Sequence, residues 1–216
     1  MLCDAKYIDM ETNWVTEQLQ TIRTLMERSA VYRRALAPIM LFAGFVGVLT
    51  AAVGLFFHFD SPRAFSGLWL AAAAVVIVGA FFIARKQALK DHEPFWSPPT
   101  RRVAQALMPA LGAGMFIGLA FLIEAENDVF FALILVWALF YGCALHAAGF
   151  FMTRGMRLFG WIYIGCACAL ICYHLSIMPL SYVVLNPHWL MGFFFGVLHL
   201  AYGAYLYLTE KGKNAA

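Results

Sequence analysis

Two histidines inside long apolar stretches, His146 and His199, are the residues best placed to do chemistry. Each lies between two glycines at helical spacing, namely Gly142 and Gly149 for the first and Gly196 and Gly203 for the second. Neutral imidazole ligates transition metals, and a pair of transmembrane histidines can hold a b-type haem. Haem ligation by this pair is therefore the sharpest chemical hypothesis, although the predicted depths of the two rings differ by about 10 Å along parallel helices.

A structural role is the simpler interpretation of both histidines. Each imidazole would then form hydrogen bonds with a neighbouring carbonyl, tyrosine or water, as polar side chains do between membrane helices. We favour this interpretation and expect no cofactor.

Cysteines offer a second candidate site. Cys168 and Cys172 are four residues apart and share one face of a helix, where two thiolates could bind a soft metal such as Cu(I) or Zn(II). Cys166 points about 200° away from Cys168 and cannot chelate with it. The same stripe otherwise carries small residues, Gly165 and Ser176, so we favour helix packing and free thiols.

The elements that carry these residues are six apolar runs. Hydrophobic residues make up 63% of the chain, charged residues 12%, and the mean hydropathy is +0.76. Soluble domains contain about 25% charged residues, and a span needs about 20 apolar residues. The sequence therefore predicts an all-α bundle of six transmembrane helices, 35–208. The spans are 35–57, 64–84, 103–123, 129–152, 158–178 and 189–208.

Basic residues predict the orientation of the bundle. Of 15 Lys and Arg residues, all but Arg63 lie before the first span, after the last, or in alternate connections between spans. The positive-inside rule then places both termini in the cytoplasm, including the tail 209–216. The net charge of +3 reflects this topology, and we expect no binding to nucleic acid.

The polar segment 1–34 precedes the first span and contains one amphipathic pattern. Between about residues 12 and 33, apolar side chains recur at helical spacing, at Val15, Leu19, Ile22 and Met26. We expect a helix that lies on membrane lipid at the cytoplasmic interface. Assembly into a homo-oligomer, or docking of a cytoplasmic partner, is the alternative use of this face.

Small residues recur along the predicted spans in stripes that let helix backbones approach closely. The glycines expected at these contacts are Gly47, Gly54, Gly114, Gly118, Gly192, Gly196 and Gly203. These stripes predict a compact helical bundle.

Charged residues are absent from the six apolar runs. Carriers coupled to ions or protons normally keep a buried carboxylate or basic partner, and a retinal protein needs a lysine within a span. The composition argues against both classes.

Three groups of residues resemble a known family. They are Ile22-Arg23-Thr24-Leu25-Met26-Glu27-Arg28-Ser29, then Trp137, Tyr141 and Gly142, and finally Phe195-Gly196-Val197-Leu198-His199 with Tyr202-Gly203. Together they resemble a family of uncharacterised six-span bacterial inner-membrane proteins. The resemblance implies this topology and a bacterial inner membrane, but no activity and no catalytic residue. The cysteine-rich fifth span departs from the family.

These observations leave three hypotheses of function. We favour a non-enzymatic bundle that senses or scaffolds, with the N-terminal helix as its cytoplasmic output. The first alternative is a haem- or metal-binding membrane protein that uses His146 and His199. The second is a transporter of an uncharged or lipid-like solute.

Overall fold

The computed structural model describes residues 35–90, 92, 94–124, 130–152, 154–177 and 186–214. Six helices in this part of the chain are long and apolar enough to cross a membrane, and no strand occurs in it. The predicted all-α bundle of six spans is thereby confirmed, and the chain is a multi-pass membrane protein. The amphipathic helix expected over 12–33 lies outside the described residues.

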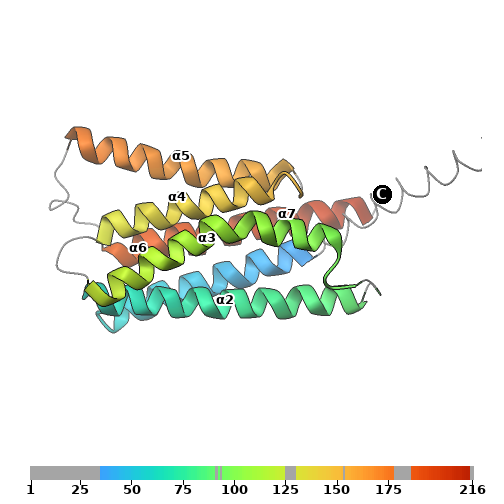
Figure 1. Cartoon of the computed structure of the whole chain (residues 1–216), viewed down its shortest axis with the longest axis horizontal. Helices are drawn as coiled ribbons and strands as arrows, with labels where there is room; N and C mark the ends of the chain where they lie inside the picture. Colours follow the sequence, from blue (N-terminus) through green and yellow to red (C-terminus); the bar gives the residue numbers. More distant parts are fainter. Residues whose placement is uncertain are drawn as a thin grey trace, which may run out of the picture.

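The six spans run back and forth along one long axis, so that consecutive spans are antiparallel (Figure 1). In chain order they are the helix Ala35–Phe56, α2 (Pro62–Lys90), α3 (Pro98–Glu124), α4 (Phe130–Ala148), α5 (Arg154–Ile177), and a composite sixth span. The sixth span consists of α6 (Pro187–Met191), the π-helical segment η2 (Gly192–Val197) and α7 (Leu198–Asn214).

Helix ends are set by local backbone chemistry. After the first span, His58 adopts a left-handed conformation with φ of 52°, and the Phe59 amide donates to the Gly54 carbonyl at 3.1 Å. This six-to-one bond is the Schellman pattern that closes a helix. At the same end of the bundle, the Arg63 guanidinium donates to the Ile123 carbonyl at 3.3 Å near the end of α3.

Several helices extend past the apolar runs that predicted them. α2 continues to Lys90, and α3 begins at Pro98, where a proline in the first turn loses no hydrogen bond. Pro109 therefore lies inside α3, where its ring removes one backbone bond. Apolar length marks the part of a helix in the membrane, and the helix itself continues into polar sequence.

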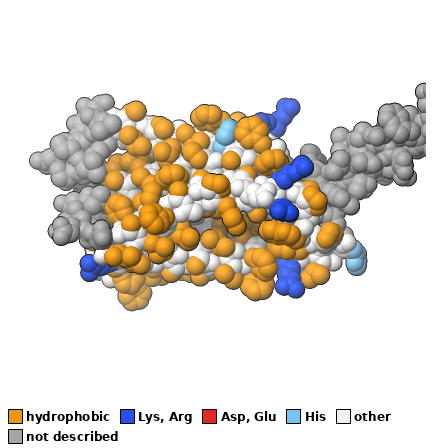
Figure 2. All heavy atoms as spheres, in the orientation of Figure 1, with side chains coloured by type: hydrophobic (Ala, Val, Ile, Leu, Met, Phe, Trp, Pro, Cys, Tyr) orange, Lys and Arg blue, Asp and Glu red, His pale blue; other side chains and the backbone are white. Residues whose placement is uncertain are grey.

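The outer surface of the bundle is apolar along its length. Hydrophobic side chains cover the middle of the visible face, while Lys and Arg side chains appear near its ends (Figure 2). Large exposed side chains include Phe45, Phe82 and Phe116. Such a surface would promote aggregation in water, whereas in a bilayer it is in contact with the apolar lipid chains.

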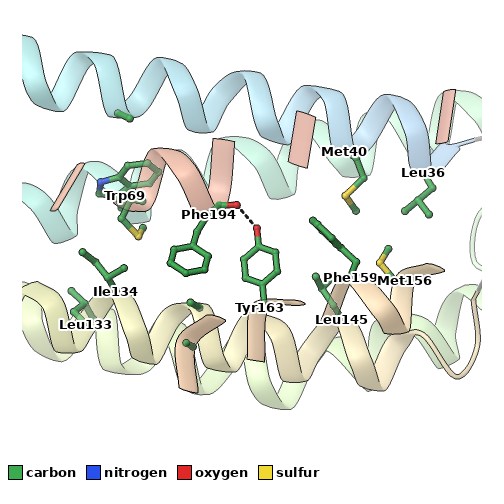
Figure 3. Close-up of a cluster of buried hydrophobic side chains, with 14 of the residues drawn as sticks. Leu36, Met40, Trp69, Leu133, Ile134, Leu145, Met156, Phe159, Tyr163 and Phe194 are labelled. Atoms are coloured by element: carbon green, nitrogen blue, oxygen red, sulfur yellow. Dashed lines mark hydrogen bonds between the residues drawn. The ribbon is translucent and has the colours of Figure 1, made fainter. Parts of the chain in front are cut away.

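The core lies between α4, α5 and the sixth span, with contributions from α2 and the first span (Figure 3). Its largest fully buried side chains include Tyr163, Phe65 and Phe194. Two histidines, His188 and His199, are buried in the same interior.

Candidate functional site: buried histidines held by tyrosine and tryptophan

His199 sits at the centre of a polar cluster that joins three spans. Its side chain on α7 is 2% exposed. The ring nitrogen Nε2 lies 2.6 Å from the hydroxyl of Tyr141 on α4, and Nδ1 lies 3.0 Å from the hydroxyl of Tyr163 on α5. Both ring nitrogens are therefore engaged by side chains of the bundle itself.

The Tyr163 hydroxyl also donates to the backbone carbonyl of Phe194 (Figure 3). That carbonyl is available because of the π-helical turn. In an unbroken α-helix the Leu198 amide would donate to Phe194, four residues back. Here it donates to Phe193, five residues back. The Tyr163 hydroxyl thus replaces the Leu198 amide as a hydrogen-bond donor to the Phe194 carbonyl.

The order of donors in this cluster follows from the number of hydrogens present. Because the single Tyr163 hydroxyl hydrogen goes to Phe194, its oxygen accepts from Nδ1–H of His199, which also lies 3.3 Å from the same Phe194 carbonyl. In the neutral ring Nε2 then carries no hydrogen and accepts from the Tyr141 hydroxyl. The result is one continuous chain from Tyr141 through His199 and Tyr163 to the Phe194 carbonyl.

Aromatic rings surround this hydrogen-bond chain. Phe159 meets the His199 imidazole edge-on, with ring centroids 5.6 Å apart, and Phe195 stacks on it at 6.2 Å. Such an arrangement keeps a neutral imidazole in one orientation and ties three helices together. A metal or haem could reach this ring only by displacing one of the tyrosines.

A second buried histidine, His188, was not among the predicted site residues. It is 1% exposed at the start of the sixth span. The Trp69 indole on α2 donates to Nδ1 at 3.2 Å, and Nε2 is 3.3 Å from the Phe59 carbonyl, to which it donates. Gly54 faces the ring so closely that a β-carbon there would collide with it.

The helix of the sixth span begins at Pro187, two residues before the predicted span start at residue 189, so His188 lies in the helix. The Asn186 side chain accepts a hydrogen bond from the His188 amide at 2.9 Å and caps α6, and Pro187 follows in the first turn. An Asn-Pro pair is a recognised helix start, so this signal was present in the sequence.

His146 has aromatic neighbours that differ from those of His199. It is half-buried on α4, with its ring edge-on to Trp161 at 5.2 Å and to Phe150 at 5.3 Å. Its Nδ1 is buried with no hydrogen-bond partner. The ring contacts of the two histidines involve different residues. The two rings thus lie in different aromatic clusters, and their joint ligation of a haem stays a prediction.

Comparison with known proteins adds nothing to this description. No protein-family model, curated protein or solved structure matches the chain. The resemblance to six-span inner-membrane proteins stays a prediction.

The cysteine stripe of α5 faces outward. Cys168 and Cys172 are both exposed, and a β-carbon added at Gly165 would meet nothing within 4 Å. The expectation that this stripe packs against another span was wrong, because α5 turns a different face to α4. Within the described ranges, no group of three or more His, Cys, Asp or Glu side chains is placed to hold a metal ion. A two-thiolate metal site at this pair stays a prediction.

Glycines bring the first and sixth spans into backbone contact. A β-carbon at Gly47 would collide with the Phe195 carbonyl, and one at Gly196 would lie 2.8 Å from Val48. The other two glycines of the sixth-span stripe face the same helix, Gly192 opposite Ala51 and Gly203 opposite Leu41.

The α3 glycines pack less uniformly. A β-carbon at Gly118 would lie 2.6 Å from the Trp137 indole, whereas one at Gly114 would make only ordinary contacts at 3.7 Å. The Gly114 carbonyl instead accepts a hydrogen bond from Trp137 Nε1 at 2.9 Å. The pair Gly142 and Gly160, which lets α4 and α5 approach each other, was not among the predicted packing glycines.

Proposed function

We propose that this chain is a non-enzymatic membrane bundle that senses or scaffolds. The observation that carries the proposal is the engagement of both His199 nitrogens by Tyr141 and Tyr163. A ligand or catalytic histidine needs one nitrogen directed at a metal, a haem or a substrate. Here the imidazole is used to join helices.

The second buried histidine supports the same conclusion. His188 accepts from Trp69 and donates to Phe59, so its nitrogens are also used between elements of the bundle. The apolar runs contain no Asp, Glu, Lys or Arg that would supply charge for coupled transport. The two fully buried histidines thus serve assembly of the fold, which suits a scaffold or a conformational sensor.

The proposed setting is a bacterial inner membrane with both termini in the cytoplasm. The antiparallel order of the spans puts the basic residues at the end of α2, the start of α3 and the start of α5 at one end of the bundle (Figures 1 and 2). Arg63 lies at the other end. Under the positive-inside rule the basic end is cytoplasmic, where membrane lipid, a second copy or a partner would meet the segment 12–33.

A spectrum and an elemental analysis of the purified full chain test the proposal. In mild detergent we expect no Soret band and no stoichiometric copper, zinc or iron, both for the unaltered chain and for His199→Ala. His146→Ala serves as the matched variant at the other intramembrane histidine. A Soret band, or stoichiometric metal, that is lost in either variant would replace the proposal with the haem or metal alternative.

A further inference from the structure

The sixth span changes its helical register in the middle. α6 and α7 are α-helical, and η2 between them widens to π geometry. A π-helical turn of this kind accommodates one extra residue in an α-helix and is frequent at functional sites. The contacts that stabilise the extra residue are therefore candidates for a functional role.

The register determines where the two buried histidines point. Eleven positions separate His188 and His199, which in an unbroken α-helix, at about 100° per residue, would set them only about 20° apart. One extra residue changes this angle by about 100°. In the structure His188 faces Trp69 on α2, whereas His199 faces Tyr141 and Tyr163 on α4 and α5. The π turn allows both sets of contacts to exist together.

Two contacts from other spans hold the π turn, and within the sixth span Nδ1 of His199 also lies 3.3 Å from the Phe194 carbonyl. The Tyr163 hydroxyl donates to the Phe194 carbonyl, which the Leu198 amide no longer serves. The Phe195 carbonyl packs against Gly47 of the first span, where no side chain would fit. One contact supplies a missing hydrogen bond, and the other supplies room for a wider turn.

We infer that η2 is a register switch and that the Tyr163 hydroxyl is its latch. When the hydroxyl donates to Phe194, the span keeps its extra residue and both histidine contacts. When the hydroxyl is withdrawn, Leu198 bonds to Phe194, the turn becomes α-helical, and α6 rotates about 100° relative to α7. That rotation separates His188 from Trp69.

Such a switch links the Asn186 end of the sixth span to its other end through one helix. A two-state element of this kind is what a membrane sensor requires. The switch rests on the proposed sensing role for its biological purpose. The helical register of the sixth span can be measured without knowing what is sensed.

The test uses the full chain in lipid nanodiscs with ¹⁵N-labelled histidine and tryptophan. The readout is the ring nitrogen shift of His188 and the indole N–H shift of Trp69, assigned with His188→Gln. We expect Tyr163→Phe to abolish the hydrogen-bonded signals of both groups. Tyr141→Phe is the matched control, because it removes a hydroxyl from His199 but not from Phe194, and it should leave His188 unchanged. Unchanged His188 signals in Tyr163→Phe would overturn the inference.

Deleting Val197 provides a second variant. Its side chain is 50% exposed, and its removal places the Leu198 amide four residues after Phe193, so that the same bond becomes α-helical. The deletion should keep the hydrogen-bonded Trp69 and His188 signals and make them insensitive to an added Tyr163→Phe. Loss of these signals on deletion, or an undiminished effect of Tyr163→Phe in the deleted chain, would contradict the switch.

If Tyr163→Phe alone does not fold, the Val197 deletion still tests the register switch. Neither readout involves a cofactor, so a haem found in the purified protein would end the proposed function without changing the register result. Conversely, unchanged His188 signals in Tyr163→Phe would overturn the register switch even if the purified protein contains no haem.

Discussion

The Trp69 indole donates its hydrogen to Nδ1 of His188 at 3.2 Å, and this bond joins the second span to the start of the sixth. The two residues are 119 positions apart in the chain. Together with the bonds of His199 to Tyr141 and Tyr163, it ties the sixth span to α2, α4 and α5 by polar contacts.

Trp69→Phe should remove this tie while keeping an aromatic ring. We expect a loss of about 1 kcal/mol in the free energy of unfolding, because the buried His188 nitrogen loses its donor. An SDS titration in mixed micelles measures the loss. Trp189→Phe, at an exposed neighbouring position, should cost much less, and equal losses in the two variants would show that the hydrogen bond contributes nothing.

His199→Ala should destabilise the bundle by about 2–4 kcal/mol, because it leaves a cavity and deprives two buried tyrosine hydroxyls of a partner. The matched variant is His146→Ala, in which the ring is half-buried and its Nδ1 has no partner. We expect it to cost less than half as much in the same SDS titration. A larger loss for His146→Ala would mean that the polar cluster is not the main tie between these spans.

Gly47→Ala should destabilise the contact between the first and sixth spans by about 1–3 kcal/mol, since the new β-carbon meets backbone atoms of Phe195 that cannot rotate away. Gly165→Ala is the control. The space around Gly165 is open, and alanine is the better helix former by about 1 kcal/mol. Thermal unfolding in detergent should therefore separate the two variants in opposite directions.

The proposed orientation predicts which end of the bundle a membrane-impermeant maleimide reaches. In a cysteine-free variant expressed in bacterial cells, Asp60→Cys should react in intact cells, because this exposed residue lies at the end opposite the basic cluster. Lys90→Cys, also exposed, should react only after permeabilisation. The reverse pattern would place both termini outside the cytoplasm.

Much of the fold could be predicted from the sequence because membrane helices are encoded by apolar length. Six runs predicted six helices, and each helix lies where its run lies. The ends were less accurate. α2 continues to Lys90 and α5 begins at Arg154, because a helix does not stop where the bilayer does.

The site was harder to predict, for a reason of geometry. His199 was recognised as a candidate and a tyrosine as one of its possible partners, but neither Tyr141 nor Tyr163 was identified as that partner. Helical spacing placed His199 on the same face as Gly196 and Gly203, yet the glycines meet the first span and the histidine meets α4 and α5. A π turn is not visible in residue spacing either, so the relation between the faces of α6 and α7 could not be assigned in advance.

The ring nitrogens of His199 provide the most direct test of the central claim that the buried imidazole joins helices and does not hold a cofactor. The measurement is a ¹⁵N spectrum of histidine-labelled full chain in lipid nanodiscs, assigned with His199→Gln. We expect a neutral ring protonated at Nδ1, with a hydrogen-bonded Nε2 that shifts in Tyr141→Phe. A metal-coordinated or paramagnetically broadened Nε2, insensitive to Tyr141→Phe, would contradict it.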